Sequence, residues 1–151
     1  MKTLRVLTTL AAAALLTLGA ASMSHAQGVR AEIGKPLQQA SELLRAGKAR
    51  EALAKAREAD AVGGKTAAEQ LIIDRMKAAA AQRANDFPTA IAALEAIHPK
   101  VGGTEAGQIA EQLAAAYAQT RNNAKATEWM NKAIAAGNNS ATIRQLQQFL
   151  L

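Results

Sequence analysis

The chain has 151 residues, no cysteine and a formal net charge of +6, and half of its residues are hydrophobic although only 3% are aromatic. The lack of cysteine excludes disulfides and thiolate metal ligands. The shortage of aromatic rings and the absence of a run of like charges argue against a nucleic-acid-binding surface, which needs stacking platforms or a basic patch.

The N-terminal segment has the three parts of a secretory signal peptide in order. Lys2 and Arg5 give a positive start, residues 7–21 are rich in alanine and leucine, and Ser24-His25-Ala26 places small residues at a signal peptidase site. The apolar stretch is too short to favour a permanent membrane span. We therefore predict a signal peptide over residues 1–26, cleavage near Ala26, and a mature protein in the periplasm or secreted.

The mature chain, residues 27–151, is predicted to form one helical domain. Its length suits a single domain, and its commonest residue, alanine, has the highest helix propensity. Its 16 basic and 12 acidic residues leave a net charge of +4, spread along the chain. We expect an all-α fold without strands.

Residues 35–62 are predicted to form the first helical hairpin. Gly34-Lys35-Pro36 opens its first helix, with proline in the first turn, where its missing N–H has no intrahelical partner to lose. Gly47 ends that helix because glycine readily adopts a left-handed conformation. The second helix runs from about residue 49 to residue 61 and stops before Gly63-Gly64.

Residues 66–98 are predicted to form the second hairpin. Thr66 and Glu69 have the spacing of a capping box, in which the two side chains satisfy backbone donors reciprocally. Pro88 lies in the first turn of the second helix, and Pro99 breaks that helix.

Residues 104–136 are predicted to form the third hairpin, and residues 140–151 a terminal helix. Thr104 is expected to cap the hairpin, and Asn122-Asn123 makes its turn. Ser140 is expected to cap the terminal helix, which has no partner helix and covers the end of the stack.

One pattern recurs in all three hairpins. Ala52, Ala90 and Ala126 lie in comparable places, 38 and 36 residues apart. In each hairpin a second apolar residue follows four positions later and a third after three more (Ala56, Leu94 and Met130; Ala59, Ile97 and Ala133). Periods of this size are typical of stacked helical units.

The pattern resembles the tetratricopeptide repeat, a helix-turn-helix unit of about 34 residues. The third hairpin carries the resemblance best, through Leu113-Ala114, Tyr117, Ala126, Met130 and Ala133. Departures from the motif are Ala56, where a large residue is usual, and Lys77 and Ala81, where leucine and tyrosine are usual. The resemblance implies antiparallel helix hairpins stacked as a short right-handed superhelix, with about seven helices after the signal peptide. The alternative is a plain helical bundle with a shared central core.

The resemblance also implies a ligand-binding face. In this family, ligands lie along the concave face formed by the first helix of each pair. By position, the residues of that face are Arg45, Arg75, Gln82, Arg83, Gln108, Glu111 and Gln119. The three arginines could grip a carboxylate or an acidic peptide by forked hydrogen bonds. Alternatively, they are ordinary solvated helix residues.

No residue pattern indicates catalysis, a metal site or a cofactor. His98, the single histidine after the signal peptide, is expected to interact with the last carbonyls of its helix. Asp74 and Arg75 are adjacent, so their side chains diverge and a surface role is expected. Tyr117 is expected in the core, whereas Trp129 is either a partner contact or packs against the terminal helix.

These features predict an exported tetratricopeptide-like protein that binds a protein or peptide and acts as a scaffold or adaptor in the cell envelope. We expect no enzymatic activity, no nucleic-acid partner and no integral membrane segment after signal cleavage. The alternative is a structural helical subunit without a dedicated peptide groove, which self-associates through its terminal helix. Its motivation is a set of apolar residues near the C-terminus (Ile143, Leu146, Phe149 and Leu150).

Overall fold

The computed structural model describes residues 28–151, so the predicted signal peptide lies outside the described residues. The described chain forms seven α-helices and one short 3-10 helix, with no strand in this range, and this confirms the predicted all-α class. The helices are α1 (Ala31–Arg45), α2 (Ala49–Asp60), α3 (Ala67–Arg83), α4 (Phe87–Ile97), α5 (Gly103–Gln119), α6 (Asn123–Ala135) and α7 (Ala141–Leu150), and the 3-10 helix is η2 (His98–Lys100).

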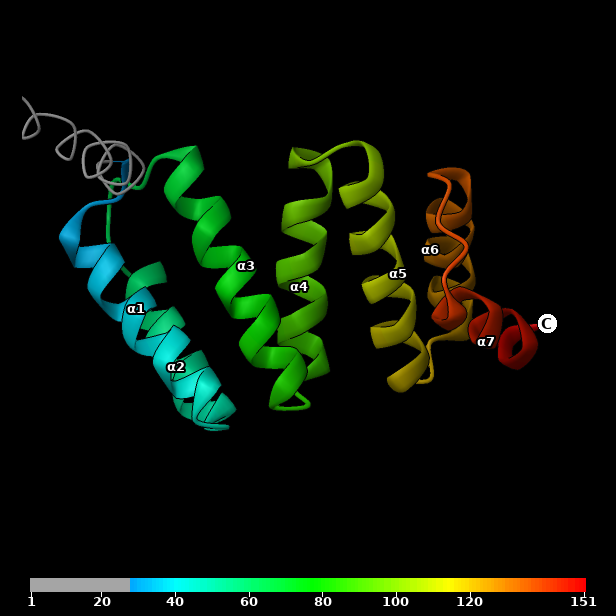
Figure 1. The fold of residues 1–151 in the computed structure, drawn as a ribbon, viewed down its shortest axis with the longest axis horizontal. Coiled ribbons are helices and arrows are strands. Elements are labelled where there is room, and N and C mark those ends of the chain that lie inside the picture. The colour runs from blue at the N-terminus through cyan, green and yellow to red at the C-terminus, as the bar shows by residue number, and fades with distance from the viewer. Residues whose placement is uncertain (1–27) are drawn as a thin grey trace, which may run out of the picture.

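The helices stand in a row of antiparallel pairs, α1/α2, α3/α4 and α5/α6, with α7 at the C-terminal end (Figure 1). Each helix packs against the next one along the chain. In addition, α1 packs against α3, and α5 packs against α7. The first helices of the first two pairs therefore pack directly against one another, and α7 packs against the first helix of the third pair.

The three hairpins share one turn geometry. The turn residues Gly47, Asn85 and Arg121 all have positive φ, at 76°, 57° and 61°. In each turn, the next residue donates its N–H back to a carbonyl five positions earlier, as in Lys48 N to Leu43 O at 2.8 Å. This is the Schellman arrangement, which satisfies carbonyls left free at a helix end. The repetition seen in the sequence therefore extends to the backbone.

The predicted helix starts agree with the structure in two helices, α3 and α7, and differ from it in two, α5 and α1. Thr66 and Glu69 form the predicted capping box, and the hydroxyl of Ser140 accepts the N–H of Ile143. The prediction for Thr104 is wrong, because Gly102 precedes α5 and provides no side-chain cap. A glycine there adopts the extended entry into the helix, so α5 begins one residue before Thr104.

The predicted start of the first helix is also wrong, because α1 begins at Ala31 and Pro36 lies inside it. The carbonyl of Arg30 accepts the N–H groups of Ile33 and Gly34, which starts the helix early. Proline at this place removes only the bond to the carbonyl of Glu32, a residue on the exposed side of the first turn.

The repeated small residues lie in the core of the helix stack. Ala52, Ala90 and Ala126 are all completely buried. The six apolar residues that follow them at the repeated spacings are buried as well (Ala56, Leu94, Met130, Ala59, Ile97 and Ala133). A side chain of one carbon lets the two helices of a pair approach closely, so packing density compensates for the small area that each alanine buries.

Candidate functional site

The seven residues predicted to form a ligand-binding face all lie on α1, α3 and α5, the first helices of the three pairs. Arg45 is exposed near the end of α1. Arg75, Gln82 and Arg83 lie on α3, and Gln108, Glu111 and Gln119 lie on α5. Direct contacts between α1 and α3 bring part of this set onto one side of the molecule.

Several of these side chains join neighbouring helices. Arg75 of α3 forms an ion pair with Glu105 of α5. The amide of Gln82 donates to the amide oxygen of Gln112 at 2.9 Å, again from α3 to α5. Two of the three α3 residues of the predicted face therefore have partners on α5, and neither partner was predicted from the sequence.

A third link joins α3 to α1. The Nη1 atom of Arg83 donates to the carbonyl of Leu44 at 3.3 Å. Lysine and arginine side chains commonly satisfy carbonyls at helix C-termini in this way. Of the three arginines predicted to grip a carboxylate, Arg75 and Arg83 thus already interact within the chain.

One stripe of α5 lines two cavities. Its residues follow a spacing of four and three (Thr104, Gln108, Glu111, Ala115 and Ala118), so they lie on a single side of the helix. The N-terminal half of the stripe faces the loop before α7, and the C-terminal half faces α7 itself. This spacing was the sequence signal that could have located both cavities.

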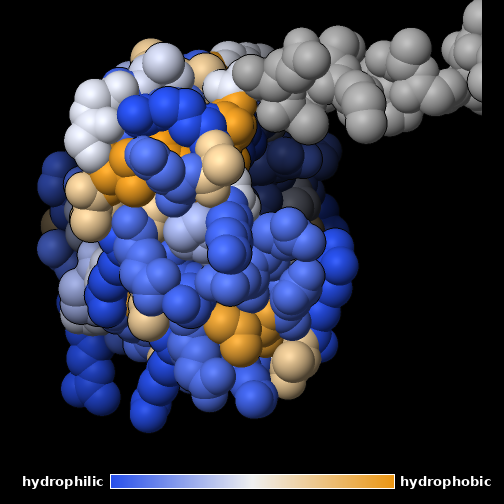
Figure 2. All heavy atoms as spheres, turned by 90° about the vertical axis from the view of Figure 1, so that its left-hand side faces the viewer, coloured by the Kyte–Doolittle hydropathy of each residue, from blue (hydrophilic) through white to orange (hydrophobic). Residues whose placement is uncertain are grey.

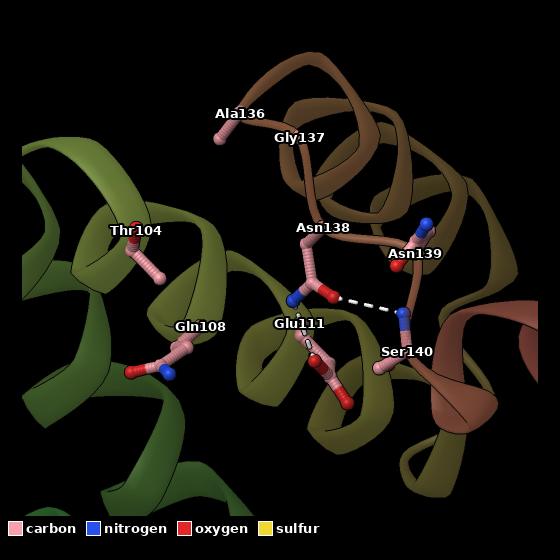
Figure 3. Close-up of a pocket in the computed structure, with 8 residues that line it drawn as sticks. All are labelled: Thr104, Gln108, Glu111, Ala136, Gly137, Asn138, Asn139 and Ser140. Carbon is pink, nitrogen blue, oxygen red and sulfur yellow. Dashed lines mark hydrogen bonds between the residues drawn. The ribbon is translucent and has the colours of Figure 1, made fainter.

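The first cavity, here called the loop pocket, has a volume of about 320 Å³. It is lined by Thr104, Gln108, Glu111, Ala136, Gly137, Asn138, Asn139 and Ser140 (Figure 3). Asn138 organises it: its amide donates to the Glu111 carboxylate at 2.6 Å, and its oxygen accepts the N–H of Ser140 at 3.0 Å. The one charged group in the lining, Glu111, is therefore engaged by the loop.

The second cavity lies between α5 and α7 and has a volume of about 570 Å³. We call it the α5–α7 groove; its lining residues are Ala115, Ala118, Gln119, Arg121, Thr142, Gln145, Leu146 and Phe149. Phe149 is 69% exposed, so much of its ring faces solvent. Arg121 is the one charged residue in this lining.

The apolar residues proposed to drive self-association fall into two groups. Ile143 and Leu146 are buried in the core that α7 shares with α5 and α6. Leu150 is half-buried, whereas Phe149 is exposed. Part of the predicted apolar surface is thus used to hold α7 on the stack.

Two ring side chains, His98 of η2 and Trp129 of α6, contact one another between the second and third pairs. Trp129 is buried, 8% exposed, in the core that also contains Ile143 and Leu146 of α7. The ring of His98 meets it edge-on, with ring centroids 4.8 Å apart, and Lys132 Nζ lies 3.9 Å from the indole centroid. The buried indole Nε1 has no hydrogen-bond partner among the described residues.

This contact changes two expectations. His98 was expected to interact with the carbonyls at its helix end, but in the described structure its ring packs against Trp129 and makes no hydrogen bond to them. Trp129, for which two roles were open, packs in the core next to α7. Tyr117 packs against the same core and is partly buried there.

Asp74 is buried rather than at the surface. Its carboxylate accepts the amide of Gln70 at 3.1 Å and pairs with Lys100 at 3.6 Å. The surface role expected from its place beside Arg75 was therefore wrong, because Asp74 is buried with partners on α3 and η2, while Arg75 is exposed.

No group of three or more His, Cys, Asp or Glu residues within residues 28–151 is arranged to hold a metal ion. In the same range, every helix is either too short or too polar to cross a membrane.

Comparison with known proteins gives no relative. No protein-family model, no curated protein and no solved structure matches the chain.

Proposed function

We propose that this chain is an exported tetratricopeptide-like module that binds a protein or peptide segment and acts as a scaffold in the cell envelope. The observation that supports it most directly is the α5–α7 groove, an open cavity of about 570 Å³ beside an exposed phenylalanine. Concave sites with an apolar lining and a few polar groups are the usual place of ligand binding. The proposal includes the right-handed superhelical twist of the family and assigns no catalytic step.

Site-specific photo-crosslinking tests the binding role. A photo-reactive amino acid replaces Gln119 or Gln145, which line the groove, or Ala54, an exposed residue of α2, which serves as control. We expect a discrete crosslinked protein in the envelope from the two groove positions and none from the control. Equal or absent crosslinking at all three positions would contradict the proposal.

Export is tested separately. The predicted cleavage near Ala26 leaves Gln27 as the first residue of the mature protein. N-terminal sequencing of protein from the envelope fraction should begin at Gln27. Recovery of a chain that still begins at Met1, in the cytoplasm alone, would remove the cell-envelope part of the proposal.

The alternative, a self-associating structural subunit, is favoured by the exposure of Phe149. The opposite end of the molecule, formed by α1 and α2, is covered mainly by hydrophilic side chains (Figure 2). Self-association would therefore use the α7 end of each copy. Sedimentation velocity distinguishes the two functions: a dimer that Phe149→Ala converts to a monomer supports the alternative, and a monomer at high concentration rejects it.

A further inference from the structure

The net positive charge of residues 27–151 is not spread evenly along the chain, as first expected, but is concentrated near α7. Residues 27–120 contain 12 basic and 11 acidic residues, whereas residues 121–151 contain four basic residues and one acidic residue, Glu128. Glu128 lies between Lys125 and Lys132, at 2.9 Å from each. The one carboxylate side chain of this segment is thus neutralised within α6, and the end of the stack keeps an excess of positive charge.

Arg121 brings this charge to the α5–α7 groove. It lies in the turn after α5 with φ of 61°, and its backbone N–H donates to Ala118 O at 3.0 Å. The turn therefore fixes the place of its Cα atom. The Arg121 side chain is exposed and, within residues 28–151, makes no hydrogen bond or ion pair. It is available to a ligand, unlike Arg75 and Arg83.

The rest of the groove is apolar or carries uncharged polar groups. Ala115, Ala118, Leu146 and Phe149 supply the apolar part. Gln119 of α5 and Gln145 of α7 supply side-chain amides, each of which can both donate and accept hydrogen bonds. Among the described residues, the lining contains no carboxylate side chain. The nearest acidic residue on α5, Glu111, lines the loop pocket instead.

We propose that the α5–α7 groove binds a partner-protein segment in which an apolar side chain lies next to a carboxylate, and that Arg121 is the residue that selects the carboxylate. The apolar side chain occupies the space beside Leu146 and Phe149, and the two glutamine amides pair with the backbone of the segment. This inference rests on the proposed peptide-binding function and adds the chemical class of the ligand.

Charge complementarity favours such a segment over a second copy of the chain. The α7 helix carries one charged side chain, Arg144, and no acidic one. Docking the α7 end of another copy on the groove would bring together two segments, residues 121–151 of each copy, that both carry four basic residues and one acidic residue. Like charges at an interface oppose association. An acidic segment instead gains a charge-assisted hydrogen bond from the guanidinium group.

Peptides of matched length test the proposal by fluorescence anisotropy with the purified protein. Each labelled peptide has the same Gly/Ser flanks and one central pair: Leu-Glu, Leu-Gln, Leu-Lys or Ser-Glu. We expect the Leu-Glu peptide to bind most tightly, and Arg121→Glu to weaken it by about tenfold or more while improving the Leu-Lys peptide. Phe149→Ala should weaken the Leu-Glu and Leu-Gln peptides alike.

Arg50→Glu is the control variant. Arg50 is exposed on α2, away from the groove, and the substitution changes the net charge by the same amount. It should leave binding of the Leu-Glu peptide within about twofold of the unsubstituted protein, because distant exposed charges are screened by salt. An equal loss in Arg50→Glu and Arg121→Glu would overturn the assignment, since only overall charge would then matter.

The outcomes separate this inference from the proposed function. If the four peptides bind equally, or none binds while groove crosslinking still captures a partner, the ligand class is wrong and the binding role stands. If neither peptides nor crosslinking gives a signal, both fail. A dimer that depends on Phe149 and excludes the peptides would show that a second copy occupies the groove, which also overturns the inference.

Discussion

Arg30, the residue before α1, forms an ion pair with Glu69 in the first turn of α3, with Arg30 Nε and Glu69 Oε1 3.2 Å apart. The carboxylate is 1% exposed and also accepts the backbone N–H groups of Thr66, at 2.9 Å, and Arg30, at 3.2 Å. The Glu69 side chain therefore takes part in the capping box of α3 and also connects the first helix pair to the second.

The environment of the Glu69 carboxylate predicts how the free energy of unfolding depends on pH. The Arg30 side chain first, and then the backbone N–H groups of Thr66 and Arg30, lower the pKa of Glu69 from 4.5 to about 2. Because the folded-state pKa is depressed, the stabilising contribution is complete above the ordinary pKa and is lost as the pH falls toward 2. Urea unfolding midpoints should decline over this window, and less steeply in Glu69→Gln. Parallel pH curves for the two proteins would show that Glu69 does not contribute.

Asn138 is predicted to hold the loop before α7. Asn138→Ala removes the donor to Glu111 and Gly107 and the acceptor for the N–H of Ser140. Leaving such partly buried groups without partners should cost about 1–3 kcal/mol in the free energy of unfolding. Asn139→Ala, at the exposed neighbour, should stay within about 0.5 kcal/mol. Chemical denaturation measures both, and equal losses would contradict this role of Asn138.

Position 47 is predicted to require glycine because of its backbone conformation, and not because of a lack of space. A Cβ atom there meets nothing within 4 Å, but φ is +76°. Gly47→Ala should therefore destabilise the protein by about 1–2 kcal/mol, the strain of a left-handed residue with a side chain. Gly63 has equal free space without a positive φ, so Gly63→Ala should be neutral or slightly stabilising. The thermal midpoints of the two variants should differ accordingly, and identical midpoints would refute the argument.

The buried alanines are predicted to tolerate no enlargement. Ala90 has no exposed surface, whereas Ala92, two residues later on α4, is exposed. Ala90→Leu should cost about 1–3 kcal/mol through overpacking, and Ala92→Leu should change stability by about 0.5 kcal/mol or less. Denaturant unfolding of both variants tests whether the repeated small position controls helix approach. A stable Ala90→Leu variant would argue for loosely packed pairs.

Tyr117 should titrate at unusually high pH. Burial first, and then its hydrogen bond to Glu95, raise the pKa of the phenol to about 12, and the two oxygens are 2.6 Å apart. Because the chain has one tyrosine, phenolate absorbance reports this group alone. Glu95→Gln should move the titration down toward the ordinary value of 10.0, since it removes a nearby negative charge. An unchanged curve would show that burial alone sets the pKa.

Most helix boundaries were predictable because their signals are local. The Thr66–Glu69 box, the Ser140 cap and the turn at Gly47 each depend on atoms a few residues apart, and all three were predicted. The start of α1 was missed because it depends on Arg30, which Glu69 holds from 39 residues away. The residue types at the start of α1 do not by themselves indicate that Arg30 is held by Glu69.

The sequence indicated which helices would carry a candidate site, but not which of their side chains pair with one another. The resemblance predicts a binding face on α1, α3 and α5. It did not include Arg121 and Gln145, which line the α5–α7 groove, or the partners Glu105 and Gln112. Which polar side chains pair across two helices depends on the rotation and spacing of those helices. Packing sets both quantities, and no short-range pattern encodes them.

The amino-acid sequence by itself determined the seven helices, their turns and the repeated buried alanines, because helix propensity, capping and apolar spacing act between residues close along the chain. Only the tertiary structure decided that Asp74 is buried, that Arg75 and Arg83 have partners, and that Arg121 lies beside the α5–α7 groove with no partner among residues 28–151. These outcomes depend on contacts between residues of different helices, whose distances exist only once the pairs have packed.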